Sequence, residues 1–293
     1  MSGRPFHGGH ARFRAGVRRF VERELAPRVE RWERDGRFPR RALAECGRRG
    51  YLALDPERNG VLAEELPRCE SLGVALTIFV QAGLVGPTLE RLATPAQKRD
   101  FLAPLTAGRL SGALAVSEPA AGSDLAALAC RATPDARGLV VDGEKTYITN
   151  AAAADFFVVA VRHEGTPEPN LSLLLVPAGA TGVRVTPLAS LGLATTAMGR
   201  IMFRRCRVPA ANVLGDPGRG YGYVQEALDR ERLYEKFEVS KYGFVASAEF
   251  CLINRNNSLF LTDKINNSSH NLQRKIDAFN LITGRIFLII ENE

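Results

Sequence analysis

The sequence predicts an α+β protein: an N-terminal all-α domain, a central antiparallel β-barrel or sandwich domain, and the truncated start of a C-terminal helical domain. Three observations lead to this prediction. Apolar residues recur at helical spacing through residues 11–112. Short β-type runs separated by turn residues then continue to about Val213, which is typical of a barrel or sandwich. A helical pattern resumes after Gly222, and strand–helix alternation is missing, so a Rossmann domain is not expected.

Proline and glycine bound the expected helices of the first domain. The first helix ends at Pro27, because proline cannot continue a helix. A second is expected over residues 40–49, and a loop over residues 55–60 leads to a third that begins near Leu62. The apolar stripe of the first helix consists of Phe13, Val17, Phe20, Val21 and Leu25.

Short apolar runs with turn clusters between them predict the strands of the second domain. Asp142-Gly143 is expected to form the turn between the first two runs, and the helix that follows from Tyr223 is expected to be cut at Leu233. The runs are Leu139–Val141, Thr146–Thr149, Phe156–Val161, Leu171–Val176, Val183–Thr186 and Ile201–Phe203. The predicted divisions of the chain are therefore 1–112, 113–214, 215–233 and a tail of different character, 234–293.

Composition excludes several classes of protein. Apolar residues make up 45% and charged residues 24% of the 293, the mixture of a globular protein with a core rather than a disordered or collagenous chain. The longest apolar run, Leu72–Val80, is too short for a membrane span, and the charges near Met1 leave no room for a signal peptide. Scattered cysteines without metal-ligand spacing predict a reduced, cytoplasmic location and no metal site: Cys46, Cys69, Cys130, Cys206 and Cys251.

The net charge of +7 is a weak guide to partners. Around the first helix arginine and glutamate are interleaved, as in Arg18, Glu22 and Arg23, which is typical of a solvated helix face. A nucleic-acid binder more often carries a stripe of one charge sign with aromatic residues between, so no nucleic-acid partner is expected. A nucleotide or coenzyme fits a mildly basic surface equally well.

The composition changes near residue 233. All 16 prolines and 25 of the 27 glycines precede Tyr234, whereas the last 60 residues contain eight asparagines and as many acidic as basic residues. A frameshift, a gene fusion or an assembly error would each produce such a change. A genuine domain with a different bias is the alternative, since composition is only a weak prior.

Two segments are candidates for chemistry. In residues 115–124, AVSEPAAGSD, a strand ends in a loop where Gly122 lets the backbone approach a ligand and Ser117 and Ser123 offer hydroxyls. In residues 142–150, DGEKTYITN, a strand places Tyr147 and Thr149 on one face. Each alone is more often an ordinary turn or strand. Together, between a helical and a β domain, they are far more specific.

With these segments the sequence resembles the acyl-CoA dehydrogenase family over about residues 11–233. The other matching segments are FVERELAP (20–27), GRFP (36–39), EEL (64–66), QKRDFLAPL (97–105), RVPA (207–210), VLG (213–215) and ERL (231–233). The resemblance implies a helical domain, a β domain and a C-terminal four-helix domain, with FAD between the last two. It also implies an acyl-CoA substrate, an electron-transfer flavoprotein or similar acceptor, and a homo-oligomer.

The resemblance also implies roles for the residues of the two segments. Ser117 would hydrogen-bond near the reactive nitrogen of the flavin, and Ser123 would reach the pyrophosphate and border the acyl-CoA channel. Tyr147 would lie against the flavin ring, and Thr149 would form a hydrogen bond with the edge of that ring. The implied cofactor-binding residues are Leu114, Val116, Ser117, Gly122, Ser123, Tyr147 and Thr149; those for substrate are Ser123, Asp229 and Arg232.

The implied reaction is α,β-dehydrogenation of an acyl thioester, in which a carboxylate takes the α-proton while the β-hydrogen leaves as hydride to the flavin. Most members carry this base in a C-terminal segment that does not match here. A minority, resembling the isovaleryl and long-chain enzymes, carry it on the helix where Glu231 stands, so Glu231 is the candidate base. The alternative is that Glu231 is an ordinary solvated or paired side chain.

The chain departs from the family pattern in two places. The stretch between Tyr51 and Leu62 is shorter than usual, and residues 234–293 do not match at all. These departures favour a truncated or frameshifted dehydrogenase whose β domain exposes apolar surface. Two other interpretations stay open: a non-catalytic remnant that binds acyl-CoA or a partner, and a flavin-dependent oxidase or monooxygenase of the same superfamily.

Overall fold

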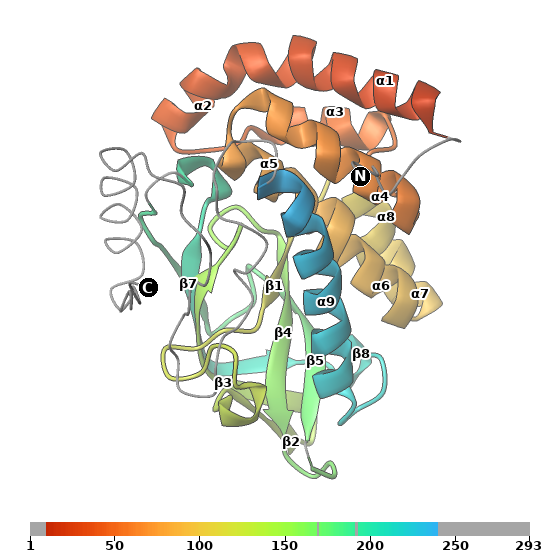
Figure 1. The fold of residues 1–293 in the computed structure, drawn as a ribbon. Coiled ribbons are helices and arrows are strands. Elements are labelled where there is room, and N and C mark those ends of the chain that lie inside the picture. The colour runs from red at the N-terminus through yellow and green to blue at the C-terminus, as the bar shows by residue number, and fades with distance from the viewer. Residues whose placement is uncertain (1–9, 169, 191–192, 240–293) are drawn as a thin grey trace, which may run out of the picture.

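The computed structural model describes residues 10–168, 170–190 and 193–239. Helices of the N-terminal domain cover one end of a β-sheet, and the long helix α9 runs from that end along one face of the sheet (Figure 1). The α-helices are α1 (Ala11–Phe20), α2 (Val29–Asp35), α3 (Arg40–Arg48), α4 (Pro56–Glu65), α5 (Leu72–Phe79), α6 (Gly86–Leu92), α7 (Pro95–Gln97), α8 (Ala103–Thr106) and α9 (Gly220–Val239). Shorter π-helical segments continue three of them: Val21–Leu25, Val80–Val85 and Lys98–Leu102.

The N-terminal helices confirm the predicted all-α domain. The apolar stripe of the first helix is buried except for Phe13, which is half-buried, and α3 begins after Pro39 as predicted. The predicted loop ahead of Leu62 is wrong, because α4 already begins at Pro56. Asp55 caps this helix by accepting a hydrogen bond from the backbone N–H of Arg58 at 2.8 Å. Aspartate followed by proline is a helix-start signal, which the glycine at position 60 obscured.

Eight strands form one sheet in the order β6-β7-β3-β2-β4-β5-β8, with β1 paired to β4 off this path. The predicted β domain is confirmed, but its sheet is mixed, since β1 and β2 both run parallel to β4. Turn residues predict only antiparallel pairing between strands that a hairpin joins. The strand β1 follows the helical domain and no hairpin, so its parallel pairing with β4 has no such signal. The strands are β1 (Gly112–Ala115), β2 (Arg131–Asp135), β3 (Gly138–Ile148), β4 (Phe156–His163), β5 (Leu171–Pro177), β6 (Val183–Pro187), β7 (Gly199–Val208) and β8 (Val213–Leu214).

The first two predicted strands are a single strand, β3, and the predicted turn at Asp142-Gly143 is wrong. Gly143 has φ +143° and lies at an irregularity in the pairing of β3 with β7. A Cβ at this position would lie 2.6 Å from the Cα of Cys130, so the backbones of two segments cross there at close range. Glycine within a strand commonly marks such a bulge or close approach rather than a turn.

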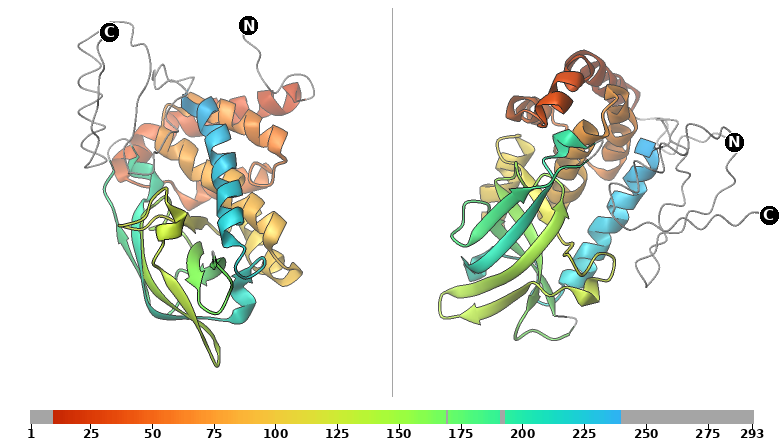
Figure 2. Two further views of the ribbon diagram at one scale, coloured as in Figure 1. Left: turned by 60° about the horizontal axis from the view of Figure 1, so that its bottom comes forward. Right: turned by 90° about the vertical axis from the view of Figure 1, so that its left-hand side faces the viewer.

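Alternate residues of the sheet face two different cores. Ala113 and Ala115 of β1 lie in a core enclosed by the sheet itself, together with side chains from β3, β4, β5 and β7. Val116 lies in a second core with residues of α6, β4, β5 and α9, and Leu114 packs against it. Leu114 and Val116 therefore face the side of α9, which lies along the sheet in both views of Figure 2, whereas Ala113 and Ala115 face the other side.

The helix α9 continues beyond the change in composition. It runs to Val239, so the expected cut at Leu233 is wrong. At its start, the hydroxyl of Ser172 on β5 accepts a hydrogen bond from the backbone N–H of Gly218 at 2.9 Å. Residues 240–293 of the predicted tail, with Cys251, lie outside the described residues.

The helical stretch Leu72–Leu92 is long and apolar enough to cross a membrane, yet 83% of its most apolar window is buried inside the protein. Core helices of soluble proteins pass the same test of length and composition, so the stretch packs as a core element. Among the described residues, the large apolar side chains that are exposed are Leu72 and Tyr147. The cysteines of the described residues are buried and free, and no group of metal-ligating side chains occurs there.

Candidate functional site

The two segments predicted to hold the flavin lie side by side. Leu114 is in β1, Val116 and Ser117 follow its end, and Tyr147 lies near the end of β3. The backbone N–H of Thr146 donates to the carbonyl of Ser117 at 2.9 Å, which joins the first segment to the second. The two segments are therefore in direct backbone contact, and their role in binding flavin stays a prediction.

The loop after β1 is tight at its base and exposed beyond it. Glu118 and Ala121 exchange two backbone hydrogen bonds, of 2.8 and 3.2 Å, which close a turn. Gly122 and Ser123, which follow this turn, are exposed, and a Cβ added at Gly122 would meet nothing within 4 Å. The open backbone at Gly122 leaves room for a ligand to approach, as its predicted role requires.

Tyr147 has an unusual conformation for its type. Its φ is +55°, and its side chain is 64% exposed, although it lies at the end of a strand whose neighbours Thr146 and Ile148 are buried. A positive φ at a bulky residue is uncommon and costs about 1–3 kcal/mol, and such strain gathers at functional sites. The strain and the exposed ring are both consistent with an aromatic side chain held outward for contact with a ligand.

The site residues fit the ring and phosphates of a flavin nucleotide in their chemistry. Leu114 is half-buried and Val116 is 6% exposed in the apolar core beside the loop, whereas the hydroxyls of Ser117, Ser123 and Thr149 form no hydrogen bond with any described residue. Unpartnered hydroxyls next to an apolar strand match a ligand with an apolar ring and polar edges. The chemistry of these predicted residues therefore fits FAD.

The predicted substrate residues lie on α9. Asp229 is exposed and Glu231 is half-buried, and both have interactions within the protein. Arg232 belongs to the same helix, but its side chain lies outside the described residues. The side of α9 that carries Val224 shares a core with Val116, so the helix and the predicted flavin loop belong to one packed unit.

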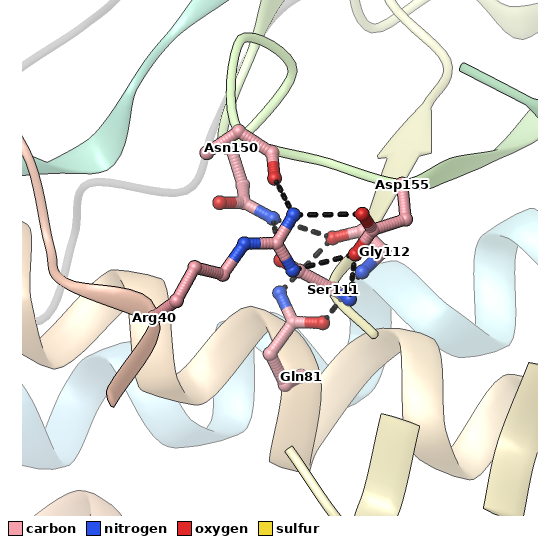
Figure 3. Close-up of polar contacts among 7 residues, drawn as sticks. Arg40, Gln81, Ser111, Gly112, Asn150 and Asp155 are labelled. Atoms are coloured by element: carbon pink, nitrogen blue, oxygen red, sulfur yellow. Dashed lines mark hydrogen bonds and ion pairs between the residues drawn. The ribbon is translucent and has the colours of Figure 1, made fainter. Parts of the chain in front are cut away.

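A polar network fixes the other end of β1 (Figure 3). Fully buried Gln81 pairs with the backbone of Gly112, donating to its carbonyl at 3.0 Å and accepting from its N–H at 2.8 Å. The same carbonyl accepts from Nδ2 of Asn150 at 2.8 Å. The strand that leads into the flavin loop and the residue after Thr149 are thus tied to one helix of the N-terminal domain.

An ion pair completes this network. Arg40 of α3 donates to both carboxylate oxygens of Asp155, at 2.5 and 2.8 Å, and to the carbonyl of Ala153. Asp155 in turn accepts from the backbone N–H of Ser111 at 2.7 Å. The paired, planar geometry of an arginine with a carboxylate holds the N-terminal domain and the sheet in one orientation.

Sequence reasoning missed a buried ion pair within the predicted site. Lys145 is fully buried, and its Nζ lies 2.7 Å from Oε1 of Glu118, which is itself buried. Burial lowers the pKa of Lys145, and the carboxylate of Glu118 opposes that shift. Both residues stand inside the two candidate segments, but no local pattern marks Lys145 as buried, since Glu144 and Thr146 flank it.

A separate cavity of about 1290 Å³ lies where the α2–α3 connection meets the sheet. Arg37 and Arg41 line it, together with Ser111 and Asn150 from the polar network. None of the residues predicted to bind flavin or substrate lines this cavity. The candidate site is therefore the strand-end surface with Ser117 and Tyr147, not this cavity.

Comparison with known proteins identifies the family of the chain. The family model of the acyl-CoA dehydrogenase N-terminal domain matches residues 9–109, and that of the middle domain matches residues 113–206. The chain is 30% identical over 247 residues to the mitochondrial long-chain specific acyl-CoA dehydrogenase of Sus scrofa, covering 78% of this chain and 56% of that protein. The chain thus spans little more than half the length of this curated relative.

Solved structures share the fold. An acyl-CoA dehydrogenase from Geobacillus kaustophilus superimposes with a TM-score of 0.75 at 32% identity, covering 81% of this chain and 66% of that one. A glutaryl-CoA dehydrogenase from Mycobacterium smegmatis in complex with FADH2 gives a TM-score of 0.72 at 25% identity, over 78% of this chain and 60% of that one. With both domain models matched in order and the fold shared, the chain belongs to the acyl-CoA dehydrogenase family.

Proposed function

We propose that this chain binds FAD between its two site segments and takes part in the α,β-dehydrogenation of an acyl-CoA thioester. The observation that carries the proposal is the hydrogen bond from Thr146 to Ser117, which brings the exposed ring of Tyr147 beside the loop that carries Ser117 and Ser123. Membership of the family supports the same assignment. FAD, when bound, supplies the acceptor for the hydride that leaves the β-carbon.

The residues of this chain would bind and orient the reactants. Leu114 and Val116 offer an apolar surface to the flavin ring, and Ser117 and Thr149 offer hydroxyls to its polar edge. Ser123, exposed beyond the turn, would reach the pyrophosphate and border the acyl-CoA channel. Asp229 and Arg232 on α9 would line the CoA and acyl pocket.

Glu231 is the proposed base. It would remove the α-proton of the thioester, and its half-buried position on α9 favours a carboxylate with restricted access to water. Glu231 stands on the helix where the resemblance places the base of isovaleryl and long-chain enzymes. The proposed electron acceptor is an electron-transfer flavoprotein or a similar protein, and the proposed assembly is a homo-oligomer. The buried free thiols support a cytoplasmic location.

The test is an anaerobic titration of the FAD-loaded chain with acyl-CoA thioesters of several lengths. We expect the visible absorption band of the flavin to bleach as the substrate is oxidised. Glu231→Gln is expected to keep FAD but to slow bleaching at least about 100-fold, because a general base contributes about 10²–10⁴-fold to the rate.

Glu226→Gln is the matched control on the same helix, where Glu226 pairs with Arg91 and Arg230, and it is expected to bleach like the unmodified chain. Bleaching that is unchanged in Glu231→Gln would remove Glu231 as the base. FAD that binds but is never reduced by any thioester would favour the non-catalytic remnant. Rapid reoxidation when air is admitted after the titration would favour an oxidase or monooxygenase.

A further inference from the structure

The buried pair of Lys145 and Glu118 ties down three consecutive residues of the flavin loop. Nζ of Lys145 donates to the carbonyl of Val116 at 2.8 Å and pairs with the carboxylate of Glu118 at 2.7 Å. Between them, the carbonyl of Ser117 accepts from the N–H of Thr146. Two neighbouring residues of β3 thus hold the backbone on both sides of Ser117.

The carboxylate of Glu118 also closes the far end of the loop. Its Oε2 accepts from the backbone N–H of Ala129 at 2.7 Å, and its Oε1 accepts from that of Cys130 at 3.0 Å. The side chain of Glu118 therefore joins the start of the loop to Cys130 at its end, twelve residues later. The exposed residues 122–124, which include Ser123, lie between these two anchor points.

Burial of both charges needs an explanation other than stability. Moving a lysine and a glutamate out of water costs several kcal/mol per ion, and replacing such a pair by apolar side chains is often neutral or stabilising. The geometry here gives a different benefit: the bonds of the pair fix backbone atoms of the loop and leave the hydroxyls of Ser117 and Ser123 without protein partners. A loop held in this way binds a ligand without the entropic cost of ordering it.

We propose that Lys145 and Glu118 are positioning residues that hold the Ser117–Cys130 loop in the conformation that receives FAD. This inference rests on the proposed function, because it assigns the loop to the flavin. Neither side chain is required to touch FAD. Their effect passes through the carbonyl of Val116 and the amides of Ala129 and Cys130.

The test compares three variants of the full chain by their FAD dissociation constant, their melting temperature and the hydrogen exchange of the loop amides. Lys145→Met leaves the carboxylate of Glu118 buried without its cation, and we expect a lower melting temperature, FAD binding weakened at least about tenfold, and faster exchange at Ala129 and Cys130. The double variant Lys145→Met/Glu118→Gln removes both charges. Its melting temperature is expected to recover, whereas FAD binding stays weak and loop exchange stays fast, because glutamine carries an NH2 group in place of one carboxylate oxygen and this group cannot accept from a backbone N–H.

Glu144→Gln is the matched control, since Glu144 is the neighbour of Lys145 on β3 and pairs with Arg200. It is expected to change FAD affinity and loop exchange by less than about twofold, as most surface substitutions do. If FAD affinity follows the melting temperature in all variants, the pair is merely structural and the proposal is overturned. If Lys145→Met does not fold, the double variant decides in the same way.

Failure of the proposed function gives a different pattern. If the unmodified chain binds no FAD, the assignment of the loop to the flavin fails, whereas hydrogen exchange still reports whether the pair orders the loop. Loop exchange as slow in the double variant as in Glu144→Gln would overturn the positioning role by itself.

Discussion

Phe156→Ala is expected to lower the free energy of unfolding by about 3–5 kcal/mol, the cost of removing a fully buried phenylalanine. Phe156 is 1% exposed, and its ring packs against that of Phe101 with centroids 5.0 Å apart and the planes at a steep angle. It also lies opposite Gly112 in the pairing of β4 with β1. Its loss would open a cavity between the N-terminal helices and the strand that leads into the flavin loop.

Denaturant unfolding followed by circular dichroism measures this effect. Phe38→Ala is the control, since Phe38 also makes an edge contact, with Trp32 at 5.3 Å, but is only half-buried. We expect this control to lose less than half as much, because less area leaves water on folding. Equal losses in the two variants would show that Phe156 does not lie in the core described here.

Gln81→Leu is expected to lower the free energy of unfolding by about 2–3 kcal/mol. The substitution keeps the approximate size of the side chain but removes both hydrogen bonds to Gly112, and the backbone N–H of Gly112 is then buried without a partner. An unsatisfied buried group of this kind costs about 1–3 kcal/mol, beyond the bonds that are lost. The carbonyl of Gly112 keeps its bond from Asn150, which limits the effect.

Denaturant unfolding followed by circular dichroism also measures the effect of Gln81→Leu. The control is Gln225→Leu, since Gln225 is exposed on α9. The control is expected to stay within about 0.5 kcal/mol of the unmodified chain. Since Gln81 holds the start of β1, we also expect weaker FAD binding in Gln81→Leu. A fully stable Gln81→Leu would contradict the account of how the N-terminal domain fixes β1.

The order of domains and the two site segments were predictable from the sequence because their signals are local. Helical spacing with Pro27 and Pro39 as boundaries, and strands with turn residues between them, require only neighbouring residues. The resemblance implies that these two segments, far apart in the chain, form one site, and the structure adds a contact between them, the hydrogen bond from the N–H of Thr146 to the carbonyl of Ser117.

Long-range contacts account for what the sequence did not predict. The sequence predicts a turn at Gly143, because the close approach of this glycine to Cys130 involves a segment outside its own strand. Lys145 and Glu118 are charged, so the sequence alone favours surface positions for both, but the fold buries them together. The parallel pairing of β1 with β4 depends on the helical domain that delivers β1, which no turn motif encodes.

The predicted roles of Glu231, Asp229 and Arg232 stay predictions. The structure places all three on α9 and brings that helix into one core with Val116. The anaerobic titration with Glu231→Gln tests the role of the base.

The most direct test of the central claim is a visible absorption spectrum of the purified chain after incubation with FAD and removal of free flavin by desalting. We predict a retained flavin band, shifted from that of free FAD by the ring of Tyr147 and the apolar surface of Leu114 and Val116. Replacing Ser117 and Thr149 together by alanine should weaken that retention. A colourless protein would contradict the claim that these residues form a flavin site.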